Sequence, residues 1–164
     1  MESRKIATLG VLTALYVVLS SFLKFSIFSN IMVDLGYIVF AVALCMYGVE
    51  GTIVGMLGCA LESLLFSAYG FSISWVSANF VIGIICGITF PLTKHNCTKY
   101  IIIIIAVAIG MLGVKTAIEC PLYGIPLAVK LPKNAVAFGV DSVTMMLGLL
   151  IYQSLKKRIG KLNE

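Results

Sequence analysis

Apolar residues recur in six long runs along the chain, and short polar stretches separate them. The runs cover residues 6–23, 32–49, 52–67, 74–90, 99–119 and 132–155. A helix that crosses a membrane needs about 20 predominantly apolar residues, since the hydrocarbon core is about 30 Å thick. The pattern therefore predicts an all-α membrane protein with six transmembrane helices, folded as a single integral membrane domain over residues 1–164.

The composition agrees with this pattern. Hydrophobic residues make up 60% of the 164 and charged residues only 12%, whereas a soluble domain has roughly 25% charged residues. We therefore expect a lipid bilayer around the chain, no soluble catalytic module and no nucleic-acid partner. The first run resembles a signal peptide, but no small-residue cleavage site follows it and further runs come after it. It is interpreted as a retained first helix.

Two residues indicate where helices begin. Asp34 stands at the start of the second run, where a carboxylate suits the positive end of a helix and can cap it. Pro132 stands at the start of the sixth run, and proline is well tolerated in the first turn of a helix. We therefore expect these helices to start close to Asp34 and Pro132.

Basic residues are unevenly shared between the two sides that six spans would define. One side carries Arg4, Lys5, Lys94, Lys99, Lys156, Lys157, Arg158 and Lys161, and the other carries Lys24, Lys115, Lys130 and Lys133. Cytoplasmic flanks of membrane helices are enriched in Lys and Arg. Both termini are therefore predicted to lie in the cytoplasm.

With this orientation, the polar residues inside the apolar sequence gather in the outer halves of the spans and in the outer loops. The candidate substrate-binding residues are Asp34, Glu62, Trp75, Asn79, Lys115, Glu119, Tyr123, Lys133, Asn134 and Asp141. Charged groups close to hydrocarbon are costly unless they pair or line a watery cavity. A pore would carry polar groups along its full depth, so polarity on one side predicts a pocket that opens outward.

Some of these residues also have a purely structural interpretation. Lys115 and Glu119 are four residues apart on one predicted helix, so they can form an ion pair that needs no ligand. Residues one to two turns inside their runs favour a binding site more strongly, and these are Asn79, Glu62 and Asp141.

Small residues recur at helical spacing. Ala7, Gly10 and Ala14 lie on one side of the first predicted helix, where they allow close approach of another helix in this chain or of a partner subunit. Glycines of the third and fourth runs repeat at intervals of three or four residues: Gly51, Gly55, Gly58, Gly83 and Gly87. They predict closely packed helix faces.

The sequence lacks the common catalytic motifs. It contains no GxxxxGK[ST] phosphate loop, no HExxH pair and no nucleophile elbow. Its five cysteines are scattered singly, which is typical of small buried residues rather than of a metal site. We therefore expect no enzyme activity, no metal and no cofactor. Six short spans also leave little room for the paired repeats of a secondary transporter.

Two stretches resemble a known family of membrane proteins. The N-terminal stretch ATLGVLTALYVVLS and the later stretch DLGYIVFAVALCMYGVEGTIVGMLGCALESLLF are similar to helices one to three of the S components of energy-coupling factor (ECF) transporters. The resemblance implies a six-helix subunit of a prokaryotic cell membrane that binds a vitamin or related micronutrient near the outer surface, with residues from helices four to six. It also implies a transmembrane coupling subunit and two cytoplasmic ATPases as partners, with Ala7, Gly10 and Ala14 facing the coupling subunit.

The resemblance leaves the ligand and two other functions open. Acidic and basic residues are mixed in the outer region, so a ligand with both donors and acceptors, including one with an anionic group, fits better than a simple cation. Trp75, Tyr69 and Tyr123 could stack on a flat ring or anchor the chain at the membrane interface. The alternatives are a self-assembling channel or small transporter, and a membrane enzyme in which Glu62 and Asp141 meet.

Overall fold

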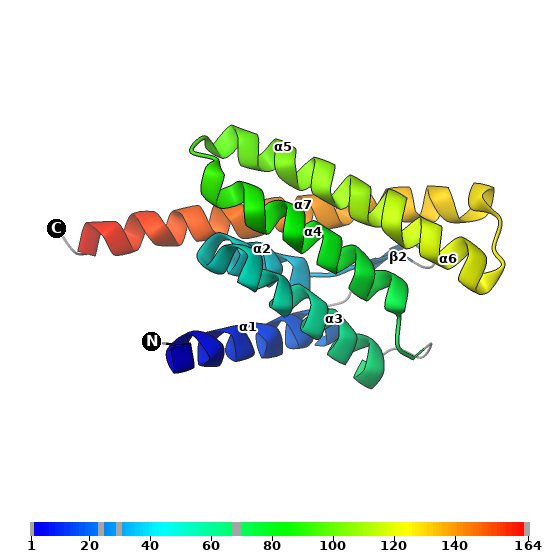
Figure 1. The fold of residues 1–164 in the computed structure, drawn as a ribbon, viewed down its shortest axis with the longest axis horizontal. Coiled ribbons are helices and arrows are strands. Elements are labelled where there is room, and N and C mark those ends of the chain that lie inside the picture. The colour runs from blue at the N-terminus through cyan, green and yellow to red at the C-terminus, as the bar shows by residue number, and fades with distance from the viewer. Residues whose placement is uncertain (1, 23–24, 29–30, 67–69, 163–164) are drawn as a thin grey trace.

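The computed structural model describes residues 2–22, 25–28, 31–66 and 70–162, which form a bundle of helices with one short β-hairpin (Figure 1). The α-helices are α1 (Glu2–Phe22), α2 (Gly36–Tyr47), α3 (Thr52–Phe66), α4 (Ile73–Leu92), α5 (Asn96–Val107), α6 (Thr116–Tyr123) and α7 (Leu127–Leu162). The 3₁₀-helix η1 (Gly48–Gly51) joins α2 to α3, and the π-helix η2 (Ala108–Lys115) joins α5 to α6.

Five helical stretches of the described chain are long and apolar enough to cross a membrane. They are Ser3–Phe22, Gly36–Phe66, Ile73–Leu92, Asn96–Tyr123 and Leu127–Arg158. The prediction of an all-helical membrane protein is thus confirmed. The second stretch contains both the second and the third predicted spans, joined through η1.

The turn at η1 is sharp. Gly48 has a φ of 57°, a left-handed conformation that favours glycine. A Cβ atom on Gly51 would lie 2.6 Å from the carbonyl carbon of Ala43, so the chain comes back against α2 within eight residues. α3 therefore folds back along α2 instead of continuing it.

The bundle has two distinct ends. Both chain termini lie at one end, together with η1 and the link between α4 and α5 (Figure 1). We call this the terminal end. The β-hairpin, the start of α4 and the turn between α6 and α7 lie at the opposite end, which we call the hairpin end. Gly124, with a φ of 61°, closes the turn after α6.

The β-hairpin was not predicted. Strand β1 (Phe25–Phe28) pairs with β2 (Ile31–Val33) in antiparallel fashion, with Phe25 opposite Val33. The second helix therefore begins at Gly36 and not near residue 32. The prediction that Asp34 caps this helix is supported in part, because its Oδ1 accepts a hydrogen bond from the backbone N–H of Gly36 at 2.8 Å.

Two further helix predictions need correction. α7 begins at Leu127, so Pro132 lies inside the helix and not in its first turn. The predicted regular helix over residues 99–119 contains the π-helical segment η2. Thr116 Oγ1 accordingly donates to the carbonyl of Met111, five residues back, at 3.2 Å. Such π-segments often occur at functional sites.

The predicted glycine faces are confirmed by the packing. A Cβ atom on Gly58 would lie 2.4 Å from Tyr16 of α1, and one on Gly55 would lie 2.5 Å from the ring of Phe40. On α4, a Cβ atom on Gly83 would lie 2.5 Å from Thr52. These glycines let α3 approach α1, α2 and α4 closely enough to bury the aromatic rings of the core.

Candidate functional site

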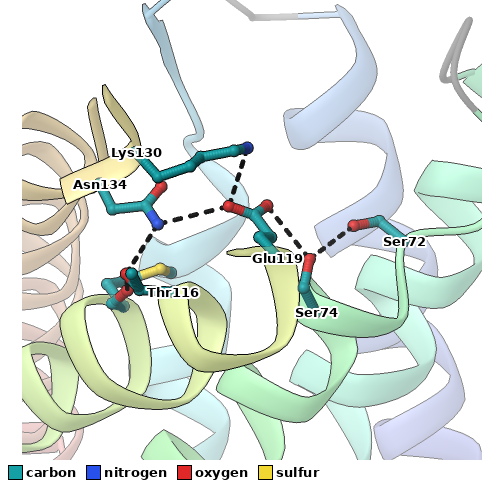
Figure 2. A network of polar contacts seen from close by, with 7 residues as sticks. Ser72, Ser74, Thr116, Glu119, Lys130 and Asn134 are labelled. Carbon is teal, nitrogen blue, oxygen red and sulfur yellow. Dashed lines mark hydrogen bonds and ion pairs between the residues drawn. The ribbon is translucent and has the colours of Figure 1, made fainter. Parts of the chain in front are cut away.

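Glu119 is the centre of a buried polar network at the hairpin end (Figure 2). Its Oε2 pairs with Lys130 Nζ at 2.9 Å and accepts from Asn134 Nδ2 at 3.3 Å. Its Oε1 accepts from Ser74 Oγ at 3.2 Å. Asn134 Nδ2 also lies 2.9 Å from Thr116 Oγ1. The network therefore joins α4, α6 and α7.

Lys115 and Trp75 form the second part of the site. Lys115 is 4% exposed, and its Nζ lies 3.4 Å from the centre of the Trp75 ring. This is a close cation–π contact, which is strongest when the cation is removed from water. The predicted ion pair between Lys115 and Glu119 is not found. Instead, the Glu119 carboxylate points toward α7 and Lys130, while Lys115 points toward α4.

A third group of polar residues lies deeper in the bundle. Asn79 is fully buried and its Oδ1 accepts from Tyr37 OH at 2.7 Å. Within the described residues, Asn79 Nδ2 and Asp141 Oδ2 are buried without a hydrogen-bond partner. Asp141, which is 1% exposed, interacts electrostatically with Lys115. A buried donor and a buried acceptor that lack a partner can each recognise a polar ligand.

The remaining candidate residues lie around this centre. Asp34 accepts from Ser20 Oγ on α1 as well as from the backbone of Gly36, and Glu62 is half-buried on α3. Tyr123 is 53% exposed and its ring lies 5.8 Å from Lys130 Nζ. Lys133 is exposed on α7. Tyr69 lies outside the described residues.

Three residues of the site were not singled out from the sequence, namely Tyr37, Ser74 and Thr116, and Lys130 was identified only as a basic residue of the outer side. Ser74 and Thr116 directly adjoin the candidates Trp75 and Lys115 in the sequence. A hydroxyl directly next to a candidate residue was the available signal. Tyr37 gave no such signal because it sits in an apolar run, where its ring alone explains its place.

The small face of α1 is on the surface of the bundle. Ala7, Gly10 and Ala14 are exposed, and nothing lies within 4 Å of where a Cβ atom on Gly10 would be. The buried side of the helix is formed by other residues, among them Tyr16 at 1% exposure. The small residues therefore do not serve packing within the described chain.

No group of three His, Cys, Asp or Glu side chains that could hold a metal ion occurs among the residues described. Two cavities, of about 620 and 510 Å³, lie at the terminal end and do not coincide with this polar centre. What the centre offers is a compact set of donors and acceptors beside one indole ring.

Comparison with known proteins identifies the family. The family model described as "ECF-type riboflavin transporter, S component" matches residues 1–156. The fold is similar to the S component for biotin from an ECF-type ABC transporter, with a TM-score of 0.70 and 19% identity, covering 95% of this chain and 92% of that one. It is also similar to FolT bound with folic acid, with a TM-score of 0.69 and 20% identity, covering 88% and 92%. No curated protein matches in sequence. The chain belongs to the family of S components of ECF-type riboflavin transporters.

Proposed function

We propose that this subunit captures riboflavin at the hairpin end of the bundle. The observation that carries the proposal is two buried groups without a hydrogen-bond partner among the described residues. They are Asn79 Nδ2, one turn after Trp75 on α4, and Asp141 Oδ2, whose carboxyl group interacts electrostatically with Lys115. The flavin ring is flat, and its imide edge has an N–H donor between two carbonyl acceptors. A carboxylate oxygen and an amide N–H are complementary to that edge.

The sugar-like side chain of riboflavin suits the Glu119 network. The ribityl chain of riboflavin carries several hydroxyl groups, each of which can donate and accept. The Glu119 network holds a carboxylate, a lysine, an asparagine amide and serine and threonine hydroxyls within one connected group. This network is the proposed place for the ribityl chain, and Trp75 is the proposed stacking partner of the ring.

We infer that the hairpin end faces the outside of a prokaryotic cell and that both termini lie in the cytoplasm. The basic residues at the terminal end support this orientation by the positive-inside rule. The fold-back of α3 along α2 at Gly48 and Gly51 supports six spans, with the Gly36–Phe66 stretch crossing the membrane twice.

Delivery into the cell requires further subunits. We infer that a transmembrane coupling subunit binds the exposed face formed by Ala7, Gly10 and Ala14, and that two cytoplasmic ATPases supply the energy. Gentle purification from the native membrane, with mass spectrometry of co-eluting proteins, tests this part. A coupling subunit with two ATPases is the expected result, and a homo-oligomer without any ATPase would support the channel alternative instead.

The ligand is tested by titrating the purified subunit with riboflavin, biotin and folate. Trp75 is the only tryptophan of the chain, so its fluorescence reports directly on the site. We expect riboflavin to quench this fluorescence at a protein-to-ligand ratio of one to one, and the other two vitamins to leave it unchanged at the same concentrations. Tight binding of biotin or folate with no effect of riboflavin would contradict the proposal.

A further inference from the structure

Two adjoining cavities at the terminal end form one groove. The cavity of about 620 Å³ is lined mainly by α7 and the start of α5, and the cavity of about 510 Å³ is lined mainly by the ends of α2 and α4. Both are lined by Lys99, Tyr152 and Lys156, so they adjoin, and we call the two together the groove. The proposed riboflavin site is at the opposite end of the bundle, and the groove takes no part in it.

The groove is strongly basic. Its lining includes Lys5, Lys99, Lys156 and Lys157 and no acidic residue. Lys5 pairs with Glu50 at its edge. In the part of the chain that the structure describes, Lys99, Lys156 and Lys157 have no ion-pair partner. Three uncompensated lysines around one cavity are suited to an anion.

Neutral donors add to this charge. Gln153 also lines the groove, and its Nε2 is buried without a hydrogen-bond partner among the described residues. Asn96 is the first residue of α5 and lines the same cavity, which places the positive end of that helix beside the lysines. A phosphate group accepts hydrogen bonds through several oxygens, and it therefore fits this set of donors.

The depth of the groove indicates a membrane surface. Lys130 and Lys156 lie on the single helix α7, 26 residues apart, which corresponds to about 39 Å along an α-helix. A bilayer with its headgroups is about 40–45 Å thick. When Lys130 is at one headgroup layer, Lys156 is therefore at the other. Just below it, the exposed Leu150 forms an apolar wall of the same cavity, with the buried Leu149 behind it.

We propose that this groove binds the phosphate headgroup of an anionic phospholipid, with an acyl chain along the exposed Leu150. The lysines and Gln153 supply the headgroup contacts, and the adjoining apolar wall favours a lipid over a free phosphate ion. Such a lipid would hold the terminal end of the bundle at the cytoplasmic surface of the membrane.

The experiment is native mass spectrometry of the purified full-length subunit with added short-chain phosphatidylglycerol or phosphatidylcholine. We expect one tightly bound phosphatidylglycerol and weaker binding of phosphatidylcholine. Because a lysine near a membrane surface contributes about fivefold to anionic lipid binding, Lys99→Gln and Lys156→Gln should each weaken phosphatidylglycerol binding about fivefold. Lys156→Arg keeps the charge and should retain the affinity.

Lys94→Gln is the matched control, since Lys94 is exposed at the same end but does not line the groove. An equal loss in Lys94→Gln would show a general effect of basic charge and overturn the proposal. Displacement of the lipid by inorganic phosphate at equal concentration would overturn its lipid part. Unchanged lipid affinity with lost assembly with the ECF partner subunits would assign the groove to a protein partner instead.

Discussion

The contact between Lys115 and Trp75 decides how the site presents its aromatic ring. The ammonium group lies 3.4 Å from the ring centre, and the lysine is almost fully buried. The contact therefore holds both the indole ring and the lysine side chain in place. A buried lysine of this kind can also donate to a carbonyl or hydroxyl of a ligand. Hydrogen bonds to charged groups contribute more to stability than neutral ones.

We therefore expect Lys115→Gln to weaken riboflavin binding by about ten- to 100-fold, the range of a hydrogen bond to a charged group. Titration of the purified subunit, followed by the fluorescence of the flavin, measures the affinity. Lys94→Gln, which removes a lysine at the opposite end, is the control and should bind as the wild type does. Equal affinities for Lys115→Gln and the control would remove Lys115 from the site.

Asn79 allows a sharper test because its two side-chain atoms have different partners. Oδ1 accepts from Tyr37 OH, whereas Nδ2 has no hydrogen-bond partner among the described residues. Tyr37→Phe should lower riboflavin affinity only about two- to tenfold, because it removes a neutral bond that orients the amide. Asn79→Ala removes the orienting bond and the ligand contact together and should have the larger effect. If the two variants lose the same affinity, Asn79 acts only by holding Tyr37.

Residue chemistry was predictable from the sequence where a polar side chain stood out against apolar neighbours. Lys115, Asn134 and Asp141 were identified in this way, and the structure buries all three. Which residues pair could not be predicted. The partner of Glu119 comes from a different helix, Lys130 on α7, and sequence spacing within one helix indicated Lys115 instead.

At the scale of elements, glycines set how closely α3 approaches its neighbours. A Cβ atom on Gly58 would lie 2.4 Å from the Tyr16 ring, so Gly58→Ala requires the ring or the helix to move. Overpacking of this kind costs about 1–3 kcal/mol. The thermal unfolding temperature of Gly58→Ala in detergent should therefore be clearly lower than that of the wild type.

Gly139→Ala is the control for this prediction, because nothing lies within 4 Å of where its Cβ would be. Alanine is the better helix former, so this variant should unfold at the wild-type temperature or slightly above it. Equal unfolding temperatures for Gly58→Ala and Gly139→Ala would show that the Tyr16 ring or helix α3 can move at little cost in stability.

The positions of secondary-structure elements could be predicted from the sequence only where hydrophobicity determines them. The apolar runs located the helices because a bilayer requires such runs. The hairpin of β1 and β2 has only seven residues in its strands and gives too short a pattern to separate from a loop. The π-helix η2 depends on backbone hydrogen bonding within an apolar sequence that would equally suit a regular helix.

At the scale of the whole molecule, the proposed function assigns the exposed small-residue face of α1 to the coupling subunit. Gly10 is exposed and has no neighbour within 4 Å of a Cβ position. A leucine at this position should therefore leave the fold and riboflavin binding intact. It should impair assembly with the coupling subunit, because small residues allow close approach between membrane helices.

Co-purification of the coupling subunit with Gly10→Leu, together with a riboflavin titration of the same variant, measures the two effects separately. Gly139→Leu is the matched control, since it places the same side chain on an exposed glycine of α7 with equally open surroundings. Retained binding with lost assembly in Gly10→Leu alone is the expected result. If Gly139→Leu impairs assembly equally, the coupling subunit recognises more of the bundle than α1. If Gly10→Leu loses binding as well, the α1 face contributes to the fold itself, and the partner surface must be sought elsewhere.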